Sequence, residues 1–369
     1  MKMKSAKQKA FMNDMITYAM VIIAFAVVQV LLAGGYMSSL MKGLLVPLCT
    51  YSIMAVSLNL VVGISGELSL GHAGFMCIGA FASALWTNIM KGTMDPKVSF
   101  VIAILIGAAT AAFFGFLIGI PVLRLRGDYL AIVTLAFGEI IKNIMNAVYL
   151  GVDSTGIHVT LKDSNALGLE KGGKIIIKGA QGITGTPKMS SFTVGVILLL
   201  IALFIVQNLI RSQTGRAIMA IRDNRIAAES IGLDVTKFKL LAFTISAAIA
   251  GVGGVLYAHN LNTLQALSKN FGYNMSIMIL VFVVMGGIGN IRGSVIAPVV
   301  LNLLLDYVLR KLQMIGSNPV LQFMSDNRML IYAIVLIAIM LVTNNAFLQA
   351  KAAKLRESLI KGKKGAKQS

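Results

Sequence analysis

Four polar residues, Glu139, Lys142, Asn143 and Asn146, lie within a long apolar segment of this 369-residue chain. If the segment is helical, residues 139, 143 and 146 share one face and residue 142 lies beside them. Charges at mid-membrane are costly, so this face should point into a helical bundle, where it could line the route of a polar solute or relay protons. Alternatively, Glu139 and Lys142 neutralise each other as an ion pair where two helices touch. The sequence leaves both interpretations open.

Asn59, Glu67 and His72 are further candidates for a polar pathway, because they lie in or beside a glycine-rich interruption, GISGELSLGHAGF, at residues 63–75. Broken helices at membrane depth are tolerated where they are buried in protein or line a cavity. A second interruption, MGGIGNIRGS at residues 285–294, loosely resembles the first. For Glu67, a position near a helix N-terminus that stabilises its charge is the stronger alternative.

No motif in the chain predicts catalysis. GLEKGGKI, at residues 168–175, has the glycine and lysine spacing of a phosphate loop, but Ile175 stands where a hydroxyl must bind magnesium. The three histidines, His72, His158 and His259, are too scattered to predict a metal site. We therefore expect the chain not to be an enzyme, and to have no catalytic residues, no metal and no cofactor.

The composition predicts that lipid is the solvent for most of the chain. Hydrophobic residues make up 57% of it and charged residues only 13%, and the mean hydropathy is +0.83, whereas soluble domains carry about 25% charged residues. The net charge of +19 comes from residues clustered at the termini and in short connections. That distribution indicates membrane topology rather than a nucleic-acid partner.

Ten segments are apolar enough to be spans, given that a helix crosses the hydrocarbon core in about 20 residues. The eighth and ninth form a short pair bent around the second glycine-rich interruption. An even number of spans places both termini on one side of the membrane. The expected spans are residues 15–33, 44–64, 72–90, 98–123, 129–150, 192–210, 240–258, 276–285, 295–308 and 330–342.

Lysine and arginine residues predict the orientation. With ten spans, 20 of them fall on the side of the termini and 12 on the other side, and the more basic side is expected to be cytoplasmic. This predicts a basic cytoplasmic N-terminus at residues 1–14 and a transmembrane domain at 15–345. Within the domain, residues 151–191 form an external loop and 211–239 a cytoplasmic loop. Residues 346–369 form a basic cytoplasmic tail.

Small residues recur at intervals of four within two of the spans, which lets helix backbones approach closely. We expect a compact bundle packed through these positions. They are Gly107, Ala111, Gly115 and Gly119 in the fourth span, and Gly251 and Gly254 in the seventh, each four residues after an alanine.

The cytoplasmic loop contains an unusually charged segment, TGRAIMAIRDNRIAAESIGLDVTK, at residues 214–237. If residues 215–232 form one helix, Arg222, Arg225 and Glu229 share a face, with the last two spaced for a weak ion pair. The opposite face is apolar and should pack on the bundle, whereas Ile218, Met219 and Ile226 remain beside the charges. Apolar groups left there favour docking to another protein over resting on lipid. The residues of the packing face are Ala217, Ala220, Ile221, Ala227, Ala228 and Ile231.

This segment resembles the coupling loop of bacterial ABC-importer permeases, a helix and turn that seat in a groove of the ATPase. Ala227, Ala228 and Gly232 match the pattern, whereas Ile226 occupies the place of its glutamate and Glu229 follows three residues later. More widely, the chain resembles the branched-chain amino acid permease family of ABC importers, LivM type. The resemblance rests on residues 57–75, GDYLAIVTLAFGEII at 127–141, GAQGITGTP at 179–187, the loop with the span that follows it, and residues 285–298.

The resemblance implies an all-α, polytopic bundle of about ten transmembrane helices with broken helices. It implies a multi-pass subunit of a bacterial cytoplasmic (inner) membrane that works by alternating access. Its partners would be a second permease in a heterodimer, two cytoplasmic ATPase subunits and an external or periplasmic binding protein that delivers leucine, isoleucine or valine. The residues expected to couple to the ATPase are Arg222, Arg225, Ala227, Ala228, Glu229 and Gly232.

Two alternatives remain open from the sequence. An ABC permease of this kind could carry another small solute, such as urea, another amino acid or a sugar. Less favoured is a proton-coupled secondary transporter that uses Glu139 and Lys142 as a relay, because such a carrier needs no coupling loop. The external loop at 151–178 is longer than the resemblance leads us to expect.

Overall fold

The computed structural model describes residues 2–125, 127–170, 172–303, 334 and 337. The chain divides into two compact units, Met1–Val300 and Leu301–Ser369, and the description below concerns the first. The expected span at 330–342, apart from two isolated residues, and the expected tail at 346–369 lie outside the described residues.

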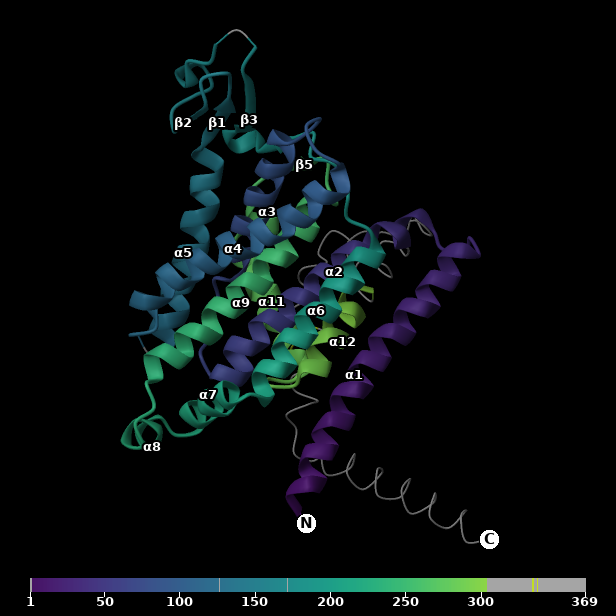
Figure 1. The fold of residues 1–369 in the computed structure, drawn as a ribbon, viewed down its shortest axis with the longest axis vertical. Coiled ribbons are helices and arrows are strands. Elements are labelled where there is room, and N and C mark those ends of the chain that lie inside the picture. The colour runs from purple at the N-terminus through teal and green to yellow at the C-terminus, as the bar shows by residue number, and fades with distance from the viewer. Residues whose placement is uncertain (1, 126, 171, 304–333, 335–336, 338–369) are drawn as a thin grey trace. The chain divides into compact units, whose positions relative to one another are not determined.

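The described part of the chain is a bundle of helices (Figure 1), as the sequence predicted. Seven of its helical segments are long and apolar enough to cross a membrane, and α12 is a shorter apolar helix. The helices are α1 (Lys2–Ala33), α2 (Ser39–Asn59), α3 (His72–Ile89), α4 (Pro96–Val122), α5 (Asp128–Ala147), α6 (Phe192–Arg211), α7 (Gln213–Asp223), α8 (Arg225–Ser230), α9 (Val235–Ala258), α10 (Ser268–Phe271), α11 (Tyr273–Gly286) and α12 (Ile291–Asn302). The seven segments are Asp14–Ala33, Ser39–Ser65, Pro96–Val122, Asp128–Ala147, Phe192–Arg211, Val235–Ala258 and Ser268–Gly286.

Both glycine-rich interruptions break helices. The first follows α2, whose last turn widens into a π-helix, η1 (Leu60–Ser65), before the chain runs without helix to α3. The second is the turn between α11 and α12, where Gly287 and Gly289 have positive φ angles of 90° and 80°. Side chains other than glycine rarely adopt that backbone conformation, which is why the interruption is rich in glycine.

The centre of the bundle is formed by α3 and α9, with α2 and α4 packed against them. Glycines bring these helices together. A methyl group added at Gly251 would lie about 2.5 Å from the carbonyl oxygen of Gly107 and from the side chain of Ala111. One added at Gly115 would lie equally close to Ala247. The predicted small residues therefore lie at close contacts between helices, with backbone at Gly107, Gly251 and Gly254 and with side chains at Gly115 and Gly119.

A small antiparallel sheet, which the sequence did not predict, occupies the loop after α5. The predicted fifth span ran to residue 150, but α5 ends at Ala147 because the following residues pair as a strand. A fifth strand, from the connection between α9 and α10, forms one edge of the sheet. The sheet lies at the opposite end of the helices from α7 and α8 (Figure 1). The order is β2-β1-β3-β4-β5, from β1 (Tyr149–Val152), β2 (Ile157–Thr160), β3 (Lys174–Lys178), β4 (Ile183–Thr184) and β5 (Thr263–Leu264), with short 3₁₀ turns η2 (Asn165–Leu167) and η3 (Gly179–Gln181) between them.

Asp153 holds the hairpin between β1 and β2 together. Its Oδ1 accepts hydrogen bonds from the Thr155 hydroxyl at 2.5 Å and the Thr155 N–H at 2.9 Å, and His158 Nε2 lies 3.1 Å away. The Thr155 hydroxyl and backbone N–H groups, which include that of Glu170, hold the pKa of this carboxyl well below its usual range. Because the pKa of Asp153 is lower in the folded chain than in the unfolded one, the carboxylate stabilises the folded state above about pH 4. This stabilisation is lost only in more acidic solution.

Candidate functional site

The segment predicted to couple to a partner forms two helices rather than one. Ser212 caps α7 by accepting the Gly215 N–H at 3.0 Å, and Asn224 caps α8 by accepting the Ala227 N–H at 3.1 Å. Asn224 has extended backbone angles, with φ −152° and ψ 101°, and therefore ends the first helix. The single helix expected over residues 215–232 was wrong for this reason.

The break at Asn224 changes which apolar side chains face outward. Ile218, predicted to lie beside the charges, is only 1% exposed, and Ala228 packs in a small buried cluster with Ile221 and Val235. Ile231, predicted to face the bundle, is 76% exposed, and Ile226 is 80% exposed. Two large aliphatic side chains thus project from α8 into the surroundings.

The end of α8 has a fixed shape. The Leu233 N–H donates to the Ala228 carbonyl at 3.1 Å, and the Gly232 N–H donates to the Glu229 carbonyl at 3.0 Å, the paired pattern of a Schellman motif. Gly232 has a φ of +85°, a left-handed conformation that costs other residues about 1–2 kcal/mol. On the outer surface, Arg225 Nε donates to Glu229 Oε1 at 2.8 Å, as the spacing predicted. Ala228 is therefore fixed by packing and Gly232 by the geometry of the turn.

Arg222 connects α7 to the first glycine-rich break. Its Nη1 donates to the carbonyl of Gly63 in η1 at 2.8 Å, and its Nε and Nη2 donate to Asp223 Oδ1 at 3.0 and 2.8 Å. Its aliphatic stem lies against Gly66, where an added methyl group would lie 2.6 Å from Arg222 Cγ. A residue predicted to touch a partner is thus also bound to the helical body.

The two glycine-rich breaks touch each other. Asn59 Oδ1 accepts the N–H of Gly289 at 2.8 Å, and Asn59 Nδ2 donates to Ser294 Oγ at 2.7 Å. A methyl group added at Gly63 would come within 3 Å of both Asn59 Oδ1 and the Gly289 backbone. A continuous set of contacts therefore runs from α7 through η1 to the turn between α11 and α12.

Glu67 and His72 make contacts between helices in the region of the first break. Glu67 forms an ion pair with Lys239 near the start of α9, and each side chain is 12% exposed. His72 is 1% exposed, and its Nε2 lies 2.8 Å from Ser246 Oγ and 3.1 Å from Ser57 Oγ. Each serine hydroxyl donates to the other serine's carbonyl at 2.6 Å, so Nε2 must be the donor to them. His72 therefore joins α3 to α2 and α9.

The polar stripe on α5 lies against the chain from Ala266 to Tyr273, which includes α10 and the first residue of α11. Glu139 Oε1 accepts the N–H of Tyr273 at 2.7 Å and Glu139 forms an ion pair with Lys142, which donates to Ser268 Oγ at 3.0 Å. Asn146 Nδ2 donates to the Ala266 carbonyl at 2.9 Å. Asn143, in contrast, is exposed. The six pathway candidates therefore do not converge on one cavity.

Comparison with known families decides the class of this protein. The sequence model of the family described as "Branched-chain amino acid transport system / permease component" matches residues 40–340, well over half of the chain. The chain belongs to this family. The permease family is polytopic and helical, in agreement with the seven apolar segments.

Individual relatives of this permease agree with the family match. It is 36% identical to the high-affinity branched-chain amino acid transport system permease protein LivM of Salmonella typhimurium, over 73% of this chain and 65% of that protein, slightly less than two thirds of its length. It is 27% identical to the nucleoside ABC transporter permease protein NupC of Lactococcus lactis, over 56% of this chain and 61% of that protein. The fructose import permease protein FruG of Bifidobacterium longum is also 27% identical, over 66% of this chain and 74% of that protein. No solved structure matches the chain.

Three features of the permease's site were not predicted from the sequence. The contact of Arg222 with Gly63 joins residues 159 positions apart, and no local pattern signals it. The sequence contains only a weak indication that Gly63 contacts Gly289, namely the loose resemblance between the two glycine-rich breaks. The exposure of Ile231 could have been inferred by treating Asn224, a strong N-cap residue, as the start of a new helix.

Proposed function

We propose that this permease is the membrane subunit of an ATP-driven importer of branched-chain amino acids. The observation that carries the proposal is α8, which exposes Ile226 and Ile231 at the opposite end of the helices from the sheet. Large apolar side chains exposed together on a charged surface are typical of a protein interface. We propose that α8 seats in a groove of a cytoplasmic ATPase subunit, with Arg225, Ala227 and Glu229 around these two residues.

The orientation supports this assignment. The end of the bundle that carries α7 and α8 is the more basic of the two in the predicted topology, so we place it in the cytoplasm of a bacterial cell and the sheet outside. An external binding protein would then meet the sheet end, and a second permease would complete the pathway. Two ATPase subunits would serve the pair.

The contacts within the chain provide a route by which the ATPase could drive transport. ATP binding would close the ATPases and move α7 and α8 as one body, because Ala228 and Ile221 pack them together. Arg222 would pull on the Gly63 carbonyl, and Asn59 and Gly63 would pass the displacement to Gly289 in the second break. Movement of two touching breaks would open and close the pathway between this permease and its sister.

The residue that we place in the pathway itself is Asn143. It is exposed within a membrane-spanning helix, and an amide in contact with lipid is unfavourable. Glu139, 24% exposed, lies one helical turn away on the same face. The other candidates, Asn59, Glu67, His72 and Asn146, are engaged between helices and would position the pathway rather than contact the solute.

The substrate assignment follows the LivM relative, and a second candidate follows from the others. Because relatives named as nucleoside and fructose permeases are also similar to this chain, another small polar solute is the alternative substrate. The proton-coupled alternative is disfavoured, because Glu139 and Lys142 already neutralise each other and the chain belongs to a family with ABC permeases.

We expect the assembly captured through a tag on this chain to take up labelled leucine into proteoliposomes loaded with ATP, and not into those loaded with a non-hydrolysable analogue. Its subunits, identified by mass spectrometry, should include an ATPase, a second permease and a binding protein. Isoleucine and valine should compete for uptake, whereas a nucleoside and fructose should not.

A proton ionophore is the control, since it removes a proton gradient but leaves ATP inside the proteoliposomes. Uptake that persists without ATP and collapses with the ionophore would overturn the importer assignment. Competition by a nucleoside or fructose instead of isoleucine would retain the importer but change its substrate.

A further inference from the structure

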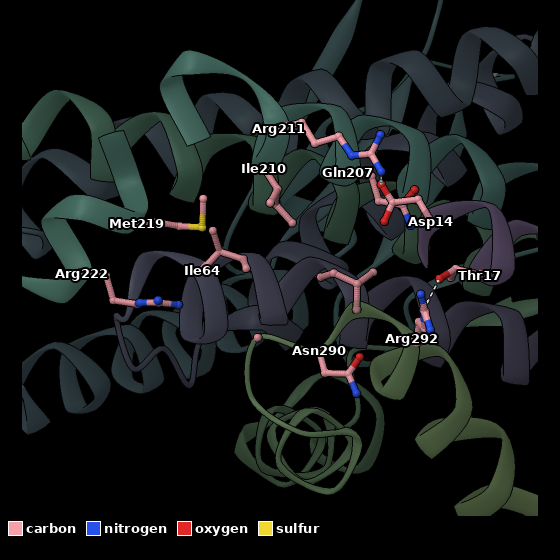
Figure 2. Close-up of a pocket in the computed structure, with 12 residues that line it drawn as sticks. Asp14, Thr17, Ile64, Gln207, Ile210, Arg211, Met219, Arg222, Asn290 and Arg292 are labelled. Carbon is pink, nitrogen blue, oxygen red and sulfur yellow. Dashed lines mark hydrogen bonds and ion pairs between the residues drawn. The ribbon is translucent and has the colours of Figure 1, made fainter. Parts of the chain in front are cut away.

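A cavity of about 530 Å³ opens beside the contact between Arg222 and the first glycine-rich break. Its walls come from α1, η1, α6, α7, the turn between α11 and α12, and the first residues of α12. Figure 2 shows Arg222 and Met219 at one end of the view, and Asp14, Gln207, Arg211 and Arg292 towards the other. We call the part of the cavity around Asp14, Gln207, Arg211 and Arg292 its second end. Neither the proposed docking of α8 nor the proposed pathway involves these residues.

The cavity is rich in arginine. Arg211, Arg222 and Arg292 line it, whereas Asp14 is its one carboxylate among the described lining residues. Asp14 forms an ion pair with Arg211, and Arg222 is bound to Gly63 and Asp223. Arg292 forms no ion pair among the described residues, and the single carboxylate of Asp14, which interacts electrostatically with both Arg211 and Arg292, cannot balance the two arginines.

Two polar atoms at the second end have no hydrogen-bond partner among the described residues. Arg292 Nε donates to Thr17 Oγ1 at 3.1 Å, but its Nη2 is buried without an acceptor among the described residues. Gln207 is only 5% exposed, and its Oε1 is buried and accepts no hydrogen bond from any described residue. Buried polar groups are normally paired. A ligand that offers an anionic oxygen to Arg292 and a hydroxyl to Gln207 would satisfy both.

The surroundings identify the source of such a ligand. A second hollow of about 390 Å³ lies between the same two helices, α1 and α6, and is lined by Tyr18 and Ile22 of the first and by Ile197, Leu200, Ile201 and Phe204 of the second. Asp14 and Arg211, which form an ion pair in the cavity, lie on the same two helices. Tyr18 is one helical turn from Asp14 in α1, and Phe204 is two turns from Arg211 in α6, so the hollow continues from the cavity along these helices. Most of the span in α1 is exposed, so lipid has access to this helix.

We propose that the cavity binds the headgroup of an anionic phospholipid that carries hydroxyl groups, such as phosphatidylglycerol. A phosphate oxygen would accept from Arg292 Nη2, since guanidinium groups match phosphate geometry. A headgroup hydroxyl would donate to Gln207 Oε1, and an acyl chain would lie along the groove between α1 and α6.

The position of the cavity gives the lipid a regulatory consequence. Arg222, Gly289 and Asn290 line the same cavity, so a bound headgroup would brace the contacts between α7 and the two breaks. This consequence rests on the proposed function, whereas lipid binding itself does not.

The test is lipid binding to the purified full chain, measured by native mass spectrometry and by thermal unfolding in detergent. Phosphatidylglycerol should remain bound and raise the unfolding temperature, whereas phosphatidylcholine should do neither. Arg292→Gln should weaken phosphatidylglycerol binding about tenfold or more, the loss expected for a charge-assisted hydrogen bond. Arg292→Lys should retain most of it. The matched control is Arg124→Gln, which removes the same charge from an exposed position outside the cavity and should bind as the unaltered chain does.

Equal retention of the two lipids, or undiminished binding by Arg292→Gln, would overturn the proposal. Inorganic phosphate or glycerol phosphate that stabilises the chain as well as phosphatidylglycerol does would show a site for a free anion instead of a lipid. If Arg292→Gln does not fold, the comparison of the lipids on the unaltered chain still decides the question, and it requires no transport activity.

Discussion

Replacing both Ile226 and Ile231 by aspartate is expected to abolish ATP-driven uptake while the permease still inserts and folds. The two side chains are 80% and 76% exposed, so the folded chain loses little when they become polar. An aliphatic hot spot contributes about 2 kcal/mol or more to an interface, so the double change should weaken ATPase binding about a hundredfold or more. Retention of the ATPase during purification measures the effect directly.

The matched control for that experiment is Ile157→Asp with Val159→Asp. These residues are 64% and 62% exposed on β2, at the sheet end of the molecule. The same chemical change there should leave retention of the ATPase unaltered. Equal loss in both variants would mean that added charge, rather than α8, is responsible, and full retention in the α8 variant would remove α8 from the interface.

The second large effect is expected from Gly63→Ala, which should stop transport by separating the two glycine-rich breaks. The added methyl group would meet Asn59 Oδ1 and the backbone of Gly289 closer than side chains approach in proteins. Neither neighbour can yield easily, because Asn59 is buried and is bonded to both Gly289 and Ser294. Overpacking of this kind costs about 1–3 kcal/mol. We expect a lower unfolding temperature and strongly reduced uptake with the ATPase still bound.

Gly43→Ala provides the comparison in the same apolar segment, Ser39–Ser65. Gly43 is exposed in α2, and an added methyl group meets no atom of the described residues within 4 Å. Alanine also favours helix more than glycine does, so uptake and unfolding temperature should be unchanged or slightly higher. If Gly63→Ala behaves like Gly43→Ala, the contact between the breaks does not carry the movement.

The membrane-spanning helices were predictable because each depends mainly on its own residues. An apolar run of about 20 residues must hydrogen-bond its backbone internally, and a helix does so locally. The expected spans at 98–123 and 192–210 therefore coincide closely with α4 and α6, and the one at 15–33 coincides with the apolar part of α1, Asp14–Ala33, although α1 itself begins at Lys2. The sheet was missed because β1 pairs with β3 across more than 20 residues, and because the edge strand β5 follows β4 only after four helices, α6 to α9.

Part of the candidate site was also predictable. The alanine and glycine pattern correctly indicated a helix that ends in a turn, because a left-handed C-terminus needs Gly232. The positions of side chains between elements were not predictable. That Arg222 reaches Gly63, that Glu67 pairs with Lys239 and that His72 lies between two serines depend on how distant helices meet. The local spacing of Glu139 and Lys142 sufficed to suggest their ion pair.

Crosslinking from α8 tests the central claim most directly. Ile226→Cys, in a chain whose buried Cys49 and Cys77 are replaced, should crosslink to the ATPase subunit in the assembled importer, with a yield that changes when ATP binds. It should be inaccessible to a membrane-impermeant thiol reagent added outside intact cells. Labelling from outside, or an assembled complex in which this cysteine never reaches the ATPase, would contradict the account.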